Sequence, residues 1–480
     1  MIINKVIISL LHKVQCHSLI LKMNMENSKR KISLIGKSKT CRRMLITMIG
    51  IILSVSAYSG NPFLPGNFAD PCIITYKDTF YIYATTSVDA TVWYSTDFKN
   101  WKLRTLNWPT STHLRNMWAP AVIQGKDGRF YAYYSLKSQI YVGVADHPLG
   151  PFSNLLPDEA PFIKSREYFP PKIHSIDADC FIDDDGQAYL YWGSGWDFKD
   201  GVCAVGKLND DMCSFKEVPV NITPKGYFEA PHVFKRDGKY YLMYSDGVYK
   251  DDTYKVRYAI SDSPLGPFIE GKNSPILVSD TIRKVHGPGH NFTLKYKDEM
   301  YIVYHKHEYP LYNGSRQVCI DKMTFDKDSY INPVIPTEED FVISVGRNEN
   351  SKQVLPTTII ASSSLNANYR SNNAFDDSMG TLWLAQDSCD AFITISFREK
   401  KRVISCEPFF AEVRGAYNFQ IDYQNEKGEW MVYYIGNNKD VEEWPITINK
   451  DVYTGAMRMN IKNADDNSRI GLWEWKIYAN

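Results

Sequence analysis

The amino-acid sequence predicts an all-β protein whose larger part is a five-bladed β-propeller. Two observations carry this prediction: a Tyr-rich motif recurs five times at spacings of 50 to 60 residues, and no helical periodicity separates the copies. The chain has 480 residues with 11 Trp, 32 Tyr and 23 Phe, a composition that excludes disordered and collagen-like proteins. This length is sufficient for about two or three domains.

The N-terminal region differs in charge from the rest of the chain. Residues 1–43 hold ten Lys or Arg and one Glu, residues 44–59 are uncharged, and residues 60–480 carry a net charge of −9. Residues 45–57 form an apolar run that follows Arg42 and Arg43 and precedes small residues, the pattern of a signal peptide. The run is shorter than the roughly 20 apolar residues that cross a bilayer, and a buried helix or strand is the alternative. We therefore expect residues 1–59 to be a leader, and the mature protein to be secreted or periplasmic, monomeric and without a membrane span.

Five copies of one motif define the predicted blades. Each copy joins an Asp-containing turn to a strand of alternating aromatic and aliphatic residues, which is typical of a β-hairpin. The copies align on Tyr81, Tyr131, Tyr189, Tyr241 and Tyr301, and each is followed by a further strand and a second turn. Several short strands in every repeat favour a propeller over residues 60–345, with a β-sandwich as the alternative fold.

The repeat also predicts a ring of polar residues. Eight residues before the turn aspartate of each copy lie, in order, Asp70, Ala119, Asp177, Glu229 and His290. The inner strand of each blade begins at this point and lines the central channel, so these positions are expected to converge. Three carboxylates and an imidazole are costly to bury together, and a functional site explains them better than a structural core does. A single Asp before Pro would more often be a turn residue, and it is the shared offset that favours the site.

Five segments of the repeat resemble glycoside hydrolase family 43: NFADPCIITYKDTFYIYATT, MWAPAVIQGKDGRFYAYYS, SIDADCFIDDDGQAYLYWG, FEAPHVFKRDGKYYLMYS and HGPGHNFTLKYKDEMYIVYH. The resemblance implies that Asp70 is the general base, that Glu229 is the general acid, and that Asp177 orients the acid and modulates its pKa. Ala178 stands where the family usually has a proline, which leaves Asp179 in competition with Asp177.

Three further residues match positions of the same family. His290 is similar to its central histidine, which often helps to hold a calcium or other ion in the channel. Arg316 resembles the arginine near the last blade that reaches the active site, and Trp118 is a candidate wall of the sugar subsite. The resemblance thus implies that His290, Arg316 and Trp118 contact substrate and that His290 is a ligand of a calcium ion.

The implied activity is that of a secreted, inverting glycosidase that cleaves arabinofuranosyl or xylosyl linkages in plant-type polysaccharides or oligosaccharides. Inversion needs one carboxylate that activates water and one protonated carboxyl that donates to the leaving oxygen, roughly 6.5–9.5 Å apart. We expect the charge of Asp177 to raise the pKa of Glu229. The alternatives are a β-galactosidase or endo-arabinanase of the same family, or a propeller lectin without turnover. No basic stretch interleaved with aromatic residues suggests a nucleic-acid partner.

Residues 354–480 differ in character from the repeats. They resemble the discoidin-like, or galactose-binding-like, module, which implies a β-sandwich of the jelly-roll type. Matching positions are Asn373, Asp376, Asp377 and Trp383 on an early loop, and Glu474 near the last strand. In that fold the loop often holds a structural calcium ion, and we expect Trp383 to anchor the core rather than to bind sugar.

Overall fold

The computed structural model describes residues 60–85, 90–106, 108, 117–309, 315–337, 352–412, 417–439, 441–464 and 468–480. These residues belong to one compact unit, Tyr58–Asn480. The predicted leader and the predicted end of the propeller at residue 345 lie outside the described residues. No helix within the described part of the chain is long and apolar enough to cross a membrane.

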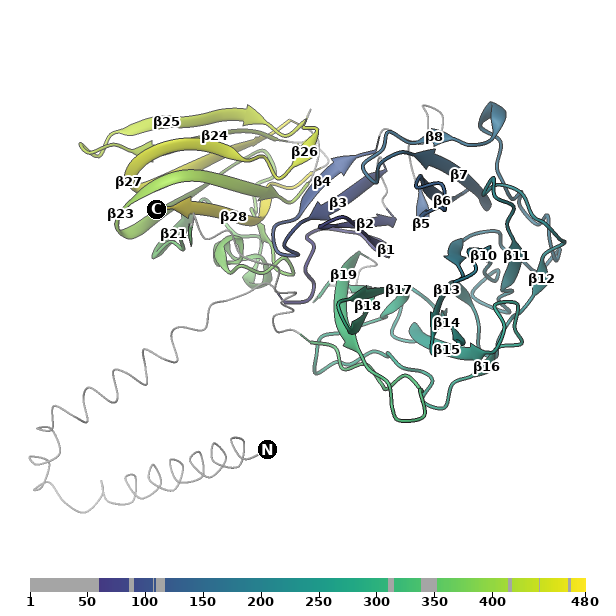
Figure 1. Ribbon diagram of the computed structural model, residues 1–480. Helices are drawn as coiled ribbons and strands as arrows, with labels where there is room; N and C mark the ends of the chain where they lie inside the picture. Colours follow the sequence, from purple (N-terminus) through teal and green to yellow (C-terminus); the bar gives the residue numbers. More distant parts are fainter. Residues whose placement is uncertain are drawn as a thin grey trace, which may run out of the picture. The chain divides into compact units, whose positions relative to one another are not determined.

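Five antiparallel sheets form the blades of a propeller, as predicted, and they follow one another around a centre (Figure 1). Blade 1 contains β1 (Ala69–Tyr76), β2 (Thr79–Thr85), β3 (Thr91–Ser95) and β4 (Lys102–Thr105). Blade 2 contains β5 (Trp118–Gln124), β6 (Phe130–Leu136), β7 (Gln139–Ala145) and β8 (Ser153–Asn154), and a short 3-10 helix, η1 (Pro157–Glu159), follows it. Blade 3 contains β9 (Asp179–Ile182), β10 (Ala188–Trp192), β11 (Ala204–Lys207) and β12 (Val220–Asn221).

The last two blades continue the same order. Blade 4 contains β13 (Glu229–Arg236), β14 (Lys239–Asp246), β15 (Lys255–Ser261) and β16 (Ile269–Glu270). Blade 5 has three strands, β17 (Gly289–Tyr296), β18 (Glu299–His307) and β19 (Arg316–Met323). The chain before β1 completes blade 5, because Phe63 N and Phe68 N donate to the carbonyl oxygens of Val318 and Arg316, at 3.2 and 2.8 Å. The ring is therefore closed by joining the start of the propeller to its last strand.

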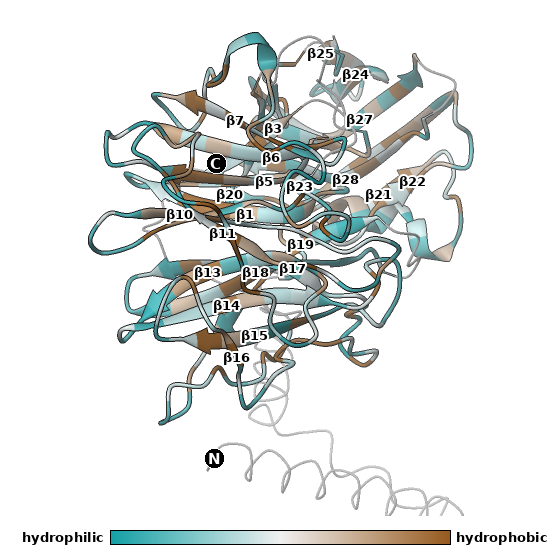
Figure 2. Cartoon of the chain, turned by 90° about the vertical axis from the view of Figure 1, so that its right-hand side faces the viewer, coloured by the Kyte–Doolittle hydropathy of each residue, from teal (hydrophilic) through white to brown (hydrophobic). Residues whose placement is uncertain are grey.

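The motif tyrosines and their aliphatic neighbours pack between blades. Each pair of neighbouring blades shares one apolar cluster, so that five clusters link the blades in a closed series. Tyr83 and Val122 lie in the cluster of blades 1 and 2, for example, and Leu242 packs with Tyr191 between blades 3 and 4. Hydrophobic residues follow the strands whereas the connecting loops are mostly hydrophilic (Figure 2). The alternating pattern thus gives each blade two apolar faces, and burying both of them requires a neighbour on each side.

A second β domain follows the propeller. Its main sheet has the order β20 (Lys352–Gln353), β28 (Gly471–Ala479), β23 (Asp390–Phe410), β27 (Ile448–Asn463), β24 (Tyr417–Gln424) and β25 (Trp430–Asn437). Outside this order, β21 (Thr358–Ala361) pairs with β23 and β22 (Trp383–Leu384) pairs with β28, and two 3-10 helices, η2 (Ala367–Tyr369) and η3 (Ser371–Phe375), lie between β21 and β22. Register shifts interrupt the pairing of β23, and Trp383 is fully buried in one large apolar cluster. This arrangement is consistent with a β-sandwich.

The second domain adds a strand to blade 1. In β26 (Glu443–Trp444), Trp444 pairs with Leu103 of β4. The buried Trp444 ring lies edge-on to Trp93 of blade 1 and to Phe409, with centroid distances of 5.5 and 5.0 Å. Lys102 Nζ also lies 3.1 Å from Glu407 Oε1. The two domains therefore share a sheet and an apolar core, rather than being joined by the connecting segment alone.

Candidate active site

Near the start of the inner strand of every blade lies a residue in the left-handed region of backbone conformation. The five residues are Asp70 (φ 53°), Ala119 (φ 43°), Asp177 (φ 59°), Ala230 (φ 59°) and His290 (φ 45°). In blades 1, 2, 4 and 5 the strand register also shifts at this residue, which marks a β-bulge. Positive φ is uncommon for residues other than glycine, and such strain is typical of functional sites. We call these five positions the upper ring.

The structure corrects the predicted ring in blade 4. Glu229 pairs with Ser245 just as Ala69 pairs with Thr85 in blade 1, so that Glu229 corresponds to the residue before Asp70. Ala230 takes the upper-ring position instead. The reason is the hairpin turn, because Asp237 is the first residue of the blade 4 turn whereas Asp78 is the second residue of the blade 1 turn. An offset counted from the aspartate is therefore one residue too long in blade 4.

Each upper-ring amide donates a hydrogen bond to the preceding blade. Ala119 N donates to Thr85 Oγ1 (2.7 Å), Asp177 N to Ser135 Oγ (2.9 Å), His290 N to Ser245 Oγ (2.8 Å) and Asp70 N to His305 Nδ1 (3.1 Å). The corresponding residue of blade 3 is Gly193, and Ala230 N donates instead to Asp177 Oδ2, at 3.2 Å. These acceptors were not predicted from the sequence, although each lies four residues after an aligned motif tyrosine.

Asp70 lies among cationic and hydrogen-bonding groups. Its Oδ1 accepts a hydrogen bond from Arg316 Nη1 at 3.1 Å and lies 3.3 Å from His290 Nδ1, while Thr85 Oγ1 donates to Oδ2 at 2.6 Å. Burial alone would raise the pKa of Asp70, but Arg316, His290 and His305 together hold it well below its usual value. Asp70 is therefore ionised over the neutral pH range.

Glu229 has the opposite protonation preference. Burial is the main cause that raises the pKa of Glu229 to about 7, and the negative charge of Asp70 adds to the effect. Two hydroxyl groups oppose the shift: Tyr254 Oη donates to Oε1 at 2.7 Å and Ser194 Oγ donates to Oε2 at 3.2 Å. Glu229 thus keeps its proton in a substantial fraction of molecules near neutral pH.

Asp177 lies buried beside the other two acids. Its Oδ2 accepts the amide of Ala230, directly after Glu229, and lies 3.9 Å from His290 Nδ1. Burial raises the pKa of Asp177 well above its usual value, and the charges of Glu229 and Asp70 raise it further. The expected effect of the Asp177 charge on the pKa of Glu229 stays a prediction, because the causes that raise the pKa of Glu229 are burial and Asp70, whereas Glu229 raises the pKa of Asp177. Such a site does not hold three negative charges at neutral pH.

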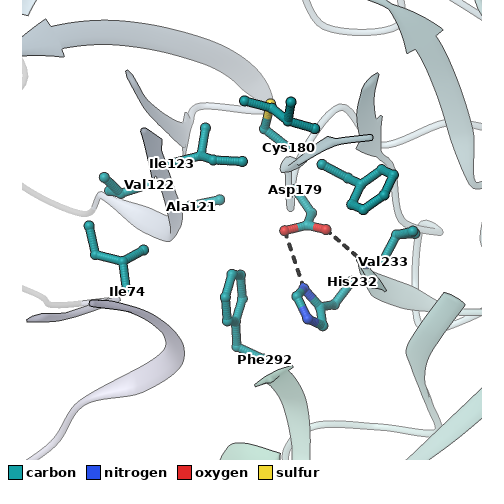
Figure 3. A pocket seen from close by; sticks show the side chains of 11 residues that line it. Ile74, Ala121, Val122, Ile123, Asp179, Cys180, His232, Val233 and Phe292 are labelled. Atoms are coloured by element: carbon teal, nitrogen blue, oxygen red, sulfur yellow. Dashed lines mark hydrogen bonds and ion pairs between the residues drawn. The ribbon is translucent and has the colours of Figure 1, made fainter. Parts of the chain in front are cut away.

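Asp179, the competitor of Asp177, belongs to a second level of the channel. Its Oδ1 lies 3.3 Å from His232 Nδ1, and its Oδ2 accepts a hydrogen bond from Val233 N at 2.9 Å. Asp179 and His232 line a cavity of about 240 Å³ together with Phe292 and several aliphatic side chains (Figure 3). Asp179 therefore contacts β13 and this cavity. Asp177 instead lies near His290, which also contacts Asp70, and accepts the amide of Ala230 beside Glu229.

The other predicted site residues, Arg316, His290 and Trp118, differ in how closely they approach the three acids. Arg316 and His290 contact Asp70, whereas Trp118 lies beside the upper-ring residue Ala119 and is 42% exposed. In the part of the chain that the structure describes, no group of three or more His, Cys, Asp or Glu side chains is arranged to hold a metal ion. Nδ1 of His290 faces Asp70 and Asp177, and calcium at His290 or at the loop of the second domain stays a prediction.

Comparisons with known proteins agree with this architecture. Residues 59–331 match the family model described as glycosyl hydrolases family 43. The chain is 33% identical over 305 residues to Beta-D-galactofuranosidase xynD of Aspergillus niger, covering 58% of this chain and 86% of that protein. It is 29% identical over 269 residues to Xylosidase/arabinosidase 43A of Humicola insolens, covering 45% and 74%. A solved structure named as a glycoside hydrolase matches 87% of this chain and all of its own, with a TM-score of 0.74 and 26% identity.

Proposed function

This chain belongs to glycosyl hydrolases family 43 and is a glycosidase, and from this premise we propose that it inverts the anomeric configuration while cleaving arabinofuranosyl or xylosyl linkages. The observation that carries the proposal is the opposite protonation of two acids in one channel. Asp70 is held ionised, as a general base must be, and Glu229 is held protonated to about pH 7, as a general acid must be.

The proposed reaction uses both acids in a single displacement. Asp70 accepts a proton from a water molecule while the water oxygen bonds to the anomeric carbon. The glycosidic C–O bond breaks at the same time, and Glu229 transfers its proton to the leaving oxygen. Asp177 is a positioning residue, because its carboxylate holds the Ala230 amide next to Glu229. Arg316 and His290 keep Asp70 in place beside the reacting centre, and Trp118 offers an exposed ring to the sugar.

The test of this proposal is a panel of 4-nitrophenyl glycosides with the purified protein: α-L-arabinofuranoside, β-D-xyloside, β-D-galactofuranoside and β-D-galactopyranoside. We expect release of 4-nitrophenol from the first or the second. A galactofuranoside is the second candidate substrate, because a relative that the chain covers to 86% is named as a galactofuranosidase. Sugar binding without release of 4-nitrophenol from any member would indicate the propeller lectin instead.

Proton NMR of the first-formed product gives an independent prediction. We expect the released sugar to appear first with the anomeric configuration opposite to that of the substrate, and to equilibrate by mutarotation afterwards. A spectrum taken within the first minutes of a fast reaction distinguishes the two outcomes. A first product with the configuration of the substrate would show a covalent intermediate and would rule out the role of Asp70 as a base.

The hydroxyl group of Tyr254 provides a prediction about pH. Tyr254→Phe removes the 2.7 Å hydrogen bond that favours the ionised form of Glu229. The pKa of Glu229 then rises above about 7, and because the acid acts only while protonated, the alkaline limb of the kcat/KM profile moves to higher pH. Tyr453→Phe, at an exposed position of β27, is the matched control and leaves the limb in place. An alkaline limb of Tyr254→Phe that stays at the same pH or moves to lower pH would contradict the assignment of Glu229 as the general acid.

We also propose that residues 354–480 form a galactose-binding-like module and that the protein is exported. The sheet order, the buried Trp383 and the single large core support the first proposal. The apolar run of residues 45–57 after Arg42 and Arg43 supports the second. N-terminal sequencing of the protein recovered outside the cytoplasm tests export, and a start near residue 58 or 60 is the expected result.

A further inference from the structure

The loop between β10 and β11 connects the proposed acid with an exposed aromatic side chain. Ser194 at its start donates to Glu229 Oε2. Four residues later, Phe198 is 38% exposed, and its ring centroid lies 5.8 Å from that of Phe228, the residue directly before Glu229. The same ring lies 5.7 Å from Tyr249. The loop therefore reaches from the carboxyl group of the acid to an aromatic surface beside it.

The loop is tightly built against the strand that carries Glu229. Gly195 N donates to Phe228 O at 3.2 Å, and a Cβ atom on Gly201 would lie only 2.2 Å from the same oxygen. Asp197 and Phe198 have φ values of 51° and 59°, an uncommon conformation for residues other than glycine. A backbone held in this way fixes the Phe198 ring relative to Glu229, and strain of this kind is typical of functional sites.

Tyr249 links this surface to the other side of the site. The guanidinium group of Arg316 lies 4.9 Å from the Tyr249 ring centroid and also hydrogen-bonds Asp70. Lys250 Nζ lies 5.6 Å from the Phe198 ring centroid and 5.5 Å from the Tyr249 ring centroid. We call Phe198 and Tyr249 the rim pair. Through Phe198 the rim pair contacts Phe228, the residue before the acid, and through Tyr249 it contacts Arg316, the arginine that holds the base.

We propose that the rim pair binds the sugar ring of the leaving group, an inference that rests on the proposed function. The anomeric carbon must lie between Asp70 and Glu229, and the leaving oxygen must lie within hydrogen-bond distance of Glu229. The next sugar ring therefore lies beyond Glu229, on the side where Phe228 and the rim pair are found. The flat, apolar face of an aromatic ring suits the C–H face of a sugar, and a few polar groups then fix its orientation.

The rim pair therefore distinguishes substrates by their leaving group. A glycosyl fluoride has no leaving sugar, and an oligosaccharide of the same terminal sugar has one. We expect Phe198→Ala to lower kcat/KM for the oligosaccharide by about 5- to 10-fold and to leave kcat/KM for the fluoride within about 2-fold of the wild type. Phe392→Ala is the matched control, because Phe392 is 39% exposed in β23 of the second domain and is expected to change neither value.

Two further variants keep the test decisive. Phe198→Trp retains an aromatic face and should retain kcat/KM for the oligosaccharide, whereas Phe198→Leu should lose it even if Phe198→Ala does not fold. Equal losses on both substrates, or no loss on either, would overturn the role of the rim pair. A wild-type protein that hydrolyses neither substrate would overturn the proposed function itself, so the two failures are distinguishable.

Discussion

Glu229→Gln is expected to lower kcat for an aryl glycoside or oligosaccharide by about 10²- to 10⁴-fold. The amide cannot donate the proton that the leaving oxygen needs, although it can keep hydrogen bonds to Tyr254 and Ser194. The loss should depend on the leaving group, because fluoride departs without protonation. Glu229→Gln should therefore retain most of its activity on the glycosyl fluoride, and its alkaline limb near pH 7 should disappear.

Asp70→Asn should show the complementary pattern. Without a carboxylate to accept the proton of water, hydrolysis of both the oligosaccharide and the fluoride should fall by a similar factor. Asp184→Asn is the control, because Asp184 is a surface residue at the blade 3 hairpin tip whose ion pair with Lys235 contributes little. Near-normal turnover of the oligosaccharide by Glu229→Gln or Asp70→Asn would refute the assignment of the two acids.

Trp444→Ala is expected to lower the free energy of unfolding by about 3–5 kcal/mol. The fully buried indole of Trp444 fills the space between Trp93 of blade 1 and Phe409 of the second domain, and its truncation leaves a cavity between these two rings. The two domains share this core, so both should become less stable together. Urea denaturation followed by tryptophan fluorescence measures the effect as a lower midpoint.

The control for this change is Tyr453→Ala, at a residue of β27 that is 55% exposed. Its free energy of unfolding should change by no more than about 0.5 kcal/mol, the range of ordinary surface substitutions, so the urea midpoint should stay close to that of the wild type. Substrate turnover gives a second readout, because the propeller holds all the proposed catalytic residues. If Trp444→Ala shifted the unfolding of the second domain alone and left the temperature at which activity is lost unchanged, the shared core would not stabilise the propeller.

Much of the propeller could be predicted because its repeats encode the same local structure five times. The aligned tyrosines identified the second strand of each blade. The turn offset predicted that Asp70, Asp177 and His290 lie together, and both carboxyl groups lie close to His290 Nδ1, at 3.3 and 3.9 Å. The eight-residue offset from the turn aspartate identified Glu229 instead of Ala230 in blade 4, because the aspartate is the first residue of that turn and the second residue of the blade 1 turn. The position four residues after each tyrosine, which accepts the hydrogen bond, could also have been located from the repeat. Its residue type varies from Thr to Ser to His, however, and so forms no recognisable motif.

Other features depended on contacts that no local pattern encodes. Tyr254, Ser194 and Phe198 come from segments outside the repeated motif, and each acquires its role only from its distance to Glu229 or Phe228. The two-residue strand β26 is too short to show periodicity, and its partner β4 lies more than 300 residues earlier in the chain. Tertiary packing decides such pairings, so the union of the two domains could not be inferred from sequence alone.

The hydrogen bonds between neighbouring blades show where the fivefold pseudosymmetry of the propeller is broken. We call the contact between two neighbouring blades at the upper ring a seam. In four seams the upper-ring amide donates to Thr85, Ser135, Ser245 or His305, and in the seam between blades 3 and 4 it donates to Asp177. A Cβ atom on Gly193 would lie 2.1 Å from Val202 O, so that a side chain cannot restore the common pattern there. The proposed acid, Glu229, directly precedes Ala230, whose amide makes this irregular hydrogen bond. Moving the site to another blade would therefore require transplanting the irregularity as well as the acids, because a perfectly regular ring would hold five equivalent seams and no distinct place for a proton donor.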